Sequence, residues 1–259
     1  MNRRLLVVIS LIVFCENLSG QASGSTPESI FPLGLSFQVG LGSYAIRDEF
    51  ISREKYSGAL PVYLCTWTDA TPSRASQISL EYRSSSTIKN YNVSASIIEF
   101  SFGLDYLYSI GKFSILSKDV AAYLGPSPEL FLHFRTQNIA SGGSAMTRAY
   151  SAAMLFSAGG TLDLACLLSD DLSADASFAT NILSFGGRFV NPENSSESFL
   201  KLLTPFSGIR FKSDIGLRYA LSSRFSVRLA YRVEIARINA WDYFISGSDM
   251  GVLSVHYGF

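Results

Sequence analysis

Residues 98–108 read Ile-Glu-Phe-Ser-Phe-Gly-Leu-Asp-Tyr-Leu-Tyr, and from Ile98 to Asp105 apolar side chains alternate with polar or small ones. This period of two is typical of a β-strand with one apolar and one polar face. No helical period competes in this stretch. The same alternation returns in five further segments, residues 33–42, 77–83, 129–135, 210–219 and 225–235. The sequence therefore predicts an all-β protein.

Four further segments complete the predicted set of strands. The last ten residues, 250–259, alternate clearly, whereas residues 59–68, 150–168 and 173–185 are apolar on both faces or rich in Ala and Ser. The direction in which this second group of side chains points is left open, including that of Trp67. In total we expect about ten strands, within a range of roughly eight to twelve.

The predicted connections alternate in length along the chain. Short ones are expected at residues 69–73, 169–172 and 222–223. Between them lie the long connections 47–58, 87–95, 136–149, 186–207 and 238–249, with 110–118 intermediate. A transmembrane barrel of the bacterial outer membrane has short periplasmic turns and longer external loops. The lengths thus favour an antiparallel transmembrane β-barrel with residues 186–207 outside the cell.

The composition is consistent with a lipid environment. Only 16% of residues are charged against 47% hydrophobic, and mean hydropathy is +0.22, whereas soluble domains average about 25% charged. Net charge is zero, which excludes a nucleic-acid footprint. After residue 15 no apolar run is long enough for a membrane helix. In a bilayer, strands must close into a barrel because each backbone group needs a partner. The alternative is a secreted β-sandwich with its apolar faces buried.

The amino terminus has the features of a secretory signal. Met1–Arg4 are basic, Leu5–Cys15 are apolar, and Gly20–Ala22 supply small residues for cleavage. The predicted organisation is a cleaved signal peptide at 1–22, a short periplasmic segment at 23–31 and a single barrel domain at 32–259. The two cysteines of the mature chain, Cys65 and Cys166, fall on opposite sides of such a barrel, too far apart to bridge.

The chain ends on an alternating strand with a terminal aromatic residue. This resembles the closing strand of bacterial outer-membrane β-barrel proteins, whose last residues are read by the barrel-assembly machinery. The resemblance implies outer-membrane lipid and that machinery as partners. The residues that it assigns to the assembly signal are Leu253, Val255, Tyr257 and Phe259.

The mature chain as a whole resembles the small outer-membrane barrels of the OmpA, OmpX and OmpW type. The resemblance is strongest in Gly216–Tyr219 and Arg224–Arg232. It implies an outer-membrane location and action as a scaffold or through surface loops, with the extracellular ligand unidentified. Ten strands depart from the eight usual in the simplest members, so the subfamily stays open.

The polar faces carry a predicted lumenal charge network. Acids from the middle strands would face bases from the late strands across a narrow interior, which side chains fill in barrels of about eight strands. A plugged lumen is therefore expected, with a narrow channel for small or apolar solutes as the alternative. The network residues are Glu81, Arg83, Glu99, Asp105, Glu129, His133, Arg135, Arg210, Lys212, Asp214, Arg218, Arg228, Arg232 and Glu234.

A hydrolase is the third possibility. Outer-membrane proteases and lipid A deacylases resemble this chain in architecture and place a His with acidic or Ser residues near the outer rim. His133 is the only candidate, because His256 lies near the other end of the barrel. A lone lumenal His is more often part of a network than a general base. The sequence predicts no catalytic residue, metal site or cofactor.

Overall fold

The structure is a computed structural model. It describes residues 33–49, 52–71, 73–90, 93–115, 117–140, 146–190, 200–240 and 243–259. The predicted signal peptide at 1–22 and the segment 23–31 lie outside these residues. Within the described part of the chain, no helix is long and apolar enough to cross a membrane.

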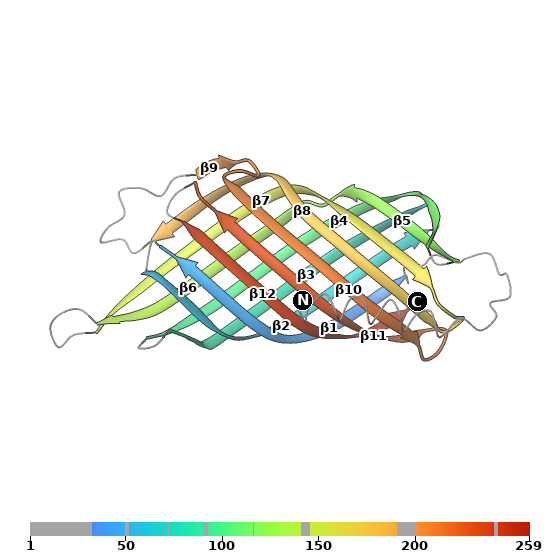
Figure 1. Cartoon of the computed structure of the whole chain (residues 1–259), viewed down its shortest axis with the longest axis horizontal. Coiled ribbons are helices and arrows are strands. Elements are labelled where there is room, and N and C mark those ends of the chain that lie inside the picture. Colours follow the sequence, from blue (N-terminus) through green and yellow to red (C-terminus); the bar gives the residue numbers. More distant parts are fainter. Residues whose placement is uncertain are drawn as a thin grey trace.

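Antiparallel strands account for nearly all of the described residues (Figure 1). In chain order they are β1 (Gly34–Asp48), β2 (Ser52–Thr71), β3 (Arg74–Lys89), β4 (Ser94–Ile115), β5 (Lys118–Pro126), β6 (Glu129–Ala140), β7 (Met146–Leu167), β8 (Leu172–Val190), β9 (Leu200–Leu203), β10 (Gly208–Ala220), β11 (Phe225–Ile238) and β12 (Phe244–Gly258). The all-β fold predicted from alternation is confirmed.

The sheet closes on itself. β1 pairs along its full length with both β2 and β12, so the first and last strands share a ladder from Gly34–Gly258 to Asp48–Phe244. β5 and β6 follow one another between β4 and β7. β9 and β10 likewise follow one another along β8. The segments thus form a ring of 10 strand positions, which agrees with the predicted number.

The division between β5 and β6 coincides with Ser127 and Pro128. Proline has no N–H to give to a ladder. Two backbone hydrogen bonds nevertheless connect this segment to the neighbouring strands. Ser127 N donates to Gly159 O on β7, and Leu104 N on β4 donates to Pro128 O, both at 3.0 Å. The wall is therefore continuous across the break.

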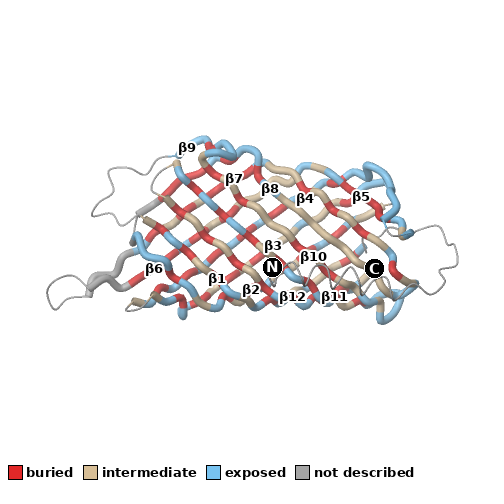
Figure 2. The backbone as a smooth tube through the Cα atoms, in the orientation of Figure 1, coloured by how far each residue is buried: buried red, intermediate tan, exposed pale blue. Residues whose placement is uncertain are grey.

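The facing of the side chains follows the sequence pattern. In β4 the odd-numbered residues from Ala95 to Gly103 are buried, whereas their even-numbered neighbours are exposed. Exposed apolar side chains include Phe37, Leu80, Phe102 and Leu229. Figure 2 shows the alternation of buried residues with intermediate or exposed ones along the strands. The barrel therefore presents an apolar outer surface, and Trp67 also points outward with 39% exposure.

The boundaries of the long connections were predicted wrongly. Strands continue through most of 47–58, 87–95, 110–118 and 238–249. Near the ends of β2, β4, β6 and β11 that lie toward the 191–207 connection, the outward side chains turn polar, as at Lys55, Ser96, Thr136 and Arg237, so the apolar alternation stops although the ladder continues. The connection between β8 and β10 is still the longest, and β9 lies within it. We call the end with the 191–207 connection the loop end and the end with residues 33 and 259 the terminal end.

At the loop end the two faces of the sheet exchange character. Many inward side chains there are apolar and buried, as at Tyr44, Ile46 and Tyr56, and many outward ones are polar. A strand needs only about 9–11 residues to cross a bilayer, and β4 and β7 each have 22. The barrel therefore continues past the apolar belt as a wall of the soluble type, polar outside and apolar inside.

Candidate functional site

The lumen is filled in layers along the barrel axis. Nearest the loop end is an apolar cluster, which we call the apolar layer. Its buried members are Tyr44, Ile46, Tyr56, Leu60, Ile88, Ala95, Ile97, Phe131, Leu155, Leu203, Ala236, Ile238 and Phe244. Below it lies a layer of paired charges, the ion-pair layer, and below that a polar cavity toward the terminal end.

Arg83 occupies the centre of the ion-pair layer. Its side chain is 2% exposed, and its Nη2 lies 2.5 Å from both Glu81 Oε1 and Glu234 Oε1. Glu99 Oε2 lies 3.7 Å from Arg83 Nη1. β3 and β11, which carry Arg83 and Glu234, are not neighbours in the ring, so this ion pair crosses the lumen.

Other pairs extend the ion-pair layer to the remaining walls. Arg210 Nη1 lies 2.5 Å from Glu129 Oε2, and Lys212 binds the other oxygen of Glu129. Arg232 bridges Glu81 and Asp214 with distances of 3.0 Å to each. These contacts join acids of β3, β6 and β10 to bases of β10 and β11.

Arg228 is the base of the layer closest to the terminal end. It contacts Asp175 and Asp214 together. Gly216 gives its guanidinium the necessary room, because a Cβ at this position would lie 2.7 Å from the Arg228 Nε atom. A glycine at position 216 thus leaves the space that the Arg228 side chain occupies.

A second polar group lies within the loop-end part of the barrel. Arg188 pairs with Asp48, and Ser151 Oγ donates to Asp48 at 3.0 Å. Arg135 packs its guanidinium carbon 4.3 Å from the centre of the Tyr56 ring and donates to Gln137 at 2.6 Å.

Sequence reasoning missed Asp48 and Arg188, since both fell in predicted loops. Continuing the even-numbered phase of β1 would have found Asp48. The same reasoning would not have found Arg188 on β8. Ile182 has no partner in the β7–β8 pairing, so beyond it the other set of alternate residues faces the lumen.

His133 is buried between the apolar and ion-pair layers. Its Nδ1 lies 3.0 Å from Glu99 Oε1, which also accepts from Tyr44 OH at 2.8 Å. Its ring meets Phe244 edge-on at 5.2 Å, and only 1% of the residue is exposed. A general base must reach its substrate, and at this exposure the ring is closed off from solvent.

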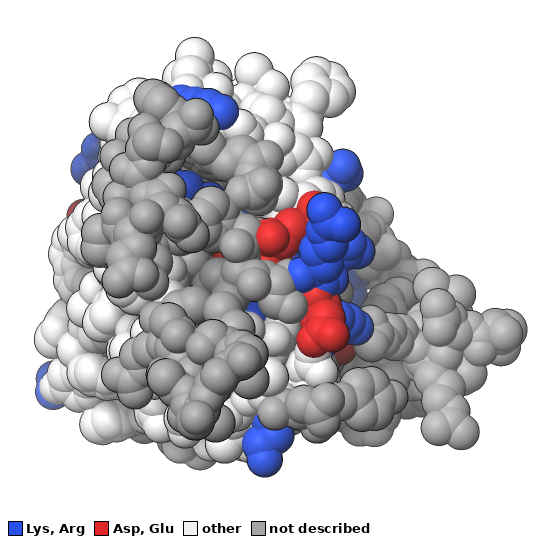
Figure 3. Space-filling model, turned by 90° about the vertical axis from the view of Figure 1, so that its left-hand side faces the viewer, with Lys and Arg blue, Asp and Glu red and all other residues white. Residues whose placement is uncertain are grey.

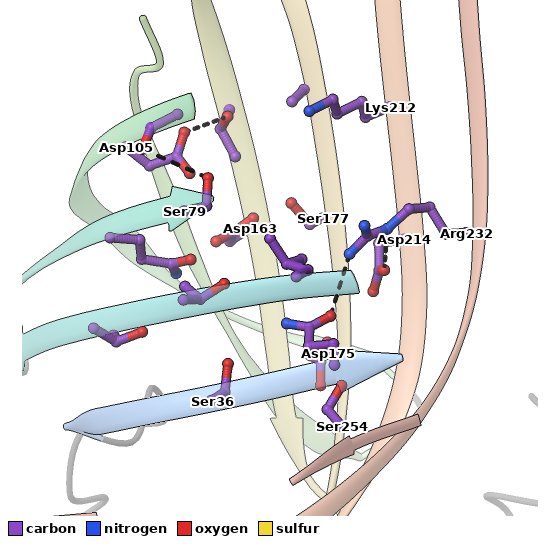
Figure 4. Close-up of a pocket in the computed structure, with 18 of the residues that line it drawn as sticks. Ser36, Ser79, Asp105, Asp163, Asp175, Ser177, Lys212, Asp214, Arg232 and Ser254 are labelled. Carbon is purple, nitrogen blue, oxygen red and sulfur yellow. Dashed lines mark hydrogen bonds and ion pairs between the residues drawn. The ribbon is translucent and has the colours of Figure 1, made fainter. Parts of the chain in front are cut away.

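The polar cavity occupies the terminal half of the lumen and measures about 220 Å³. Figure 4 shows Asp105, Asp163, Asp175 and Asp214 around it, with Lys212 and Arg232 at its border with the ion-pair layer. Arg218 and His256 also line it. Of the predicted network, Arg218 forms no ion pair with any described residue, and Asp105 binds hydroxyls instead of a base.

The last strand presents its predicted assembly residues outward. Leu253, Val255, Tyr257 and Phe259 are 52%, 47%, 36% and 73% exposed. Tyr257 packs between Phe225 and Phe259, with ring centres 5.0 and 5.5 Å away. These aromatic rings lie at the terminal end, where an interfacial girdle belongs.

The described residues offer no arrangement of three or more His, Cys, Asp or Glu side chains suited to a metal ion. Cys65 and Cys166 are not joined in a disulfide. At the loop end, charged side chains of both signs gather at the rim (Figure 3). Among them Arg47 pairs with Glu49 at 2.6 Å, and Arg47 and Arg237 each lie 5.8 Å from the ring centre of Tyr243.

Comparison with known proteins identifies the fold but no sequence family. No protein-family model and no curated protein matches the chain. Among solved structures, the outer membrane protease OmpT from Escherichia coli is 8% identical with a TM-score of 0.51, over 92% of this chain and 100% of that one. The translocator domain of the autotransporter NalP from Neisseria meningitidis is 10% identical with a TM-score of 0.49, over 99% and 96%. Neisserial surface protein A is 12% identical with a TM-score of 0.38, over 86% and 97%.

The chain has the fold of the bacterial outer-membrane β-barrel proteins, with a subfamily that the comparisons leave open. At 8% identity the likeness to a protease concerns the fold and not the reaction.

Proposed function

We propose that this protein is an integral outer-membrane β-barrel with a closed lumen, which acts as a scaffold that presents its loop end at the cell surface. The observation that carries the proposal is the ion-pair layer. Arg83, Arg210, Arg232 and their carboxylate partners join opposite walls of the barrel, and the apolar layer covers them on the loop side. A buried charge that loses its partner is costly, so this layer resists opening.

The outer-membrane location rests on the fold, the apolar outer surface and the predicted signal at 1–22. The partners in this proposal are outer-membrane lipid and, during biogenesis, the assembly machinery that reads the terminal strand. The rim around Arg47, Arg237 and Tyr243 supplies charged and aromatic groups for contact with a surface ligand, which is a common composition of binding surfaces.

Conductance across a planar bilayer tests the closed lumen. We expect the refolded protein to show no steady ion conductance. The variant Arg83→Ala, Arg210→Ala, Glu234→Ala, Phe131→Ala removes side chains from the centre of the ion-pair layer and from the apolar layer that covers it, so steps of conductance should appear. The control is Ser254→Ala, which lies in the cavity below the layer and should stay closed. Steady conductance of the unaltered protein would overturn the proposal.

That outcome would instead support a narrow channel, the second candidate. Its one structural support is the cavity, which already occupies the terminal half of the lumen. The rim-hydrolase alternative receives no support from the geometry, since His133 is enclosed by Glu99, Tyr44 and Phe244.

A further inference from the structure

The cavity at the terminal end carries charges that the protein itself does not pair. Most of its lining charges belong to the ion pairs already described. Three do not: Asp105 on β4, Asp163 on β7 and Arg218 on β10. Among the residues that the structure describes, none of the three contacts a side chain of opposite charge within ion-pair distance.

Asp163 is the most constrained of the three. It is 5% exposed, and its Oδ1 atom is buried without a hydrogen-bond partner among the described residues. The charged groups that act on it are the carboxylates of Asp105, Asp175 and Asp214. A buried carboxylate among other carboxylates is unfavourable unless it takes up a proton or a cation approaches it, and an ammonium ligand would stabilise its charged form.

Asp105 adds a second acid to the same wall. Its Oδ1 accepts from the hydroxyls of Ser127 and Thr161, the latter at 3.2 Å. Thr161 and Asp163 are successive inward positions of β7, so the two carboxylates line one part of the cavity. Lys212 attracts this carboxylate from a distance, but its direct partners are hydroxyls and no base among the described residues lies within ion-pair distance of it.

Arg218 presents the opposite charge from another wall. It lies directly across from Arg228 on β11 and from Ser173 on β8. Arg228 takes both nearby acids, Asp175 and Asp214, so Arg218 is left facing the cavity. A guanidinium keeps its charge at all physiological pH values and binds carboxylates through two parallel hydrogen bonds.

We infer that this cavity binds a small amphoteric amine, with ammonium groups at Asp163 and Asp105 and a carboxylate at Arg218. The volume of about 220 Å³ has room for a single amino acid together with water, because one water needs only about 10–15 Å³ of cavity volume measured in this way. An anion alone would leave both acids unpaired, and an amine alone would leave Arg218 unpaired.

The route of entry follows from the layers. On the loop side the cavity ends at Lys212 and Arg232 of the ion-pair layer. On the other side, Ser173 and Arg218 are the last or nearly last inward residues before the turns at 168–171 and 221–224. The ligand therefore enters and leaves from the terminal end, and the site is a binding pocket with one mouth.

Calorimetric titration of the protein in detergent micelles at pH 7 and low salt tests the inference. Lysine is the first probe, because its two ammonium groups and one carboxylate complement two acids and one Arg. The partial probes are 1,5-diaminopentane, which lacks the carboxylate, and hexanoate, which lacks the amines. We expect lysine to bind about tenfold more tightly than diaminopentane and hexanoate not to bind, since each charge-assisted contact is worth at least a factor of ten.

Two variants assign the contacts. Asp163→Asn relieves repulsion among carboxylates, so it should fold, and it should weaken both lysine and diaminopentane. Arg218→Gln should weaken lysine, which loses the partner of its carboxylate, and should not weaken diaminopentane, which makes no use of Arg218. The matched controls are Asp119→Asn and Arg224→Gln, which remove the same charges from exposed positions at the terminal end.

The inference is overturned if the unaltered protein takes up no lysine, if diaminopentane binds as tightly as lysine, or if the cavity variants titrate like their controls. None of these outcomes depends on the conductance measurement, so the closed lumen and the cavity site are tested independently.

Discussion

Leu104 and Asp105 are neighbours on β4 that meet opposite environments. Leu104 is 40% exposed on the outer surface, while Asp105 accepts hydroxyl donors in the lumen. An arginine facing lipid near the middle of the bilayer costs about 2 to 4 kcal/mol in a transmembrane barrel. We therefore expect Leu104→Arg to lower the free energy of unfolding by that amount, measured by urea titration of protein folded into lipid vesicles.

Asp105→Asn is the comparison for this substitution. The Asn side-chain oxygen can still accept from Ser127 and Thr161, so stability should change little. Equal loss of stability in both variants would mean that the facing of β4 is wrong.

Arg83 supports the largest set of buried carboxylates. Arg83→Met keeps much of the side-chain volume but leaves Glu81, Glu99 and Glu234 without their central cation. Removing one partner from a buried ion pair typically costs about 3 to 5 kcal/mol. We expect a loss of that size in urea unfolding monitored by tryptophan fluorescence.

The double variant Arg83→Met, Glu234→Gln separates the charge effect from the packing effect. It removes one of the stranded carboxylates, so part of the lost stability should return. If the double variant is less stable than Arg83→Met by the full cost of Glu234→Gln alone, the two residues do not interact across the lumen.

At the scale of elements, β12 is the strand that removes both sheet edges. Its ladders to β1 and β11 satisfy backbone groups that lipid cannot. Phe259 lies just beyond the last ladder residue and is 73% exposed. Deleting Phe259 should hardly change unassisted refolding in detergent. In cells the same deletion should strongly reduce the amount of folded barrel, because the assembly machinery is expected to read this end.

Phe206→Ala is the matched control for the deletion. Phe206 is 92% exposed but lies between β9 and β10, far from the end of the chain. Loss of this aromatic should leave insertion in cells intact. Normal insertion of the Phe259 deletion in cells would contradict the proposed role of Phe259 in assembly.

Whether a strand could be predicted from the sequence depended on the environments that its two faces meet. Alternation predicted the strands wherever one face met lipid and the other a polar lumen, as in residues 98–105. It failed beyond Tyr44 on β1 and before Leu60 on β2, because the inward face becomes apolar and the outward face polar, which weakens the signal without ending the ladder. The interruption between β5 and β6 at Pro128 and the unpaired residue Ile182 each affect only one or two residues, so a period of two cannot reveal them.

The candidate site was predictable in composition but not in pairing. Inward phase placed Arg83 and Glu234 in the lumen, yet their contact joins positions 151 residues apart. Which charges meet depends on the stagger of the strands around the ring, which sequence alone does not fix. For the same reason the unpaired state of Asp163 and Arg218 emerged only from the structure.

At the scale of the whole molecule, the two ends of the barrel differ enough to define its orientation. The terminal end has tight turns such as 221–224, while the loop end has the longest connection and the charged rim. Outer-membrane barrels place short turns in the periplasm. Asn239 and Ser223 are exposed residues at the loop end and the terminal end, so each can report the side on which its end lies.

Single cysteines at these two positions test the orientation, in a background with Cys65→Ala and Cys166→Ala. A bulky maleimide that cannot cross the outer membrane should label Asn239→Cys on intact cells, because the loop end faces the medium. It should label Ser223→Cys only after the outer membrane is opened. Labelling of Ser223→Cys on intact cells, with Asn239→Cys protected, would reverse the barrel. The pocket mouth would then face the medium, and the charged rim around Arg47 and Tyr243 could no longer serve as a binding surface outside the cell.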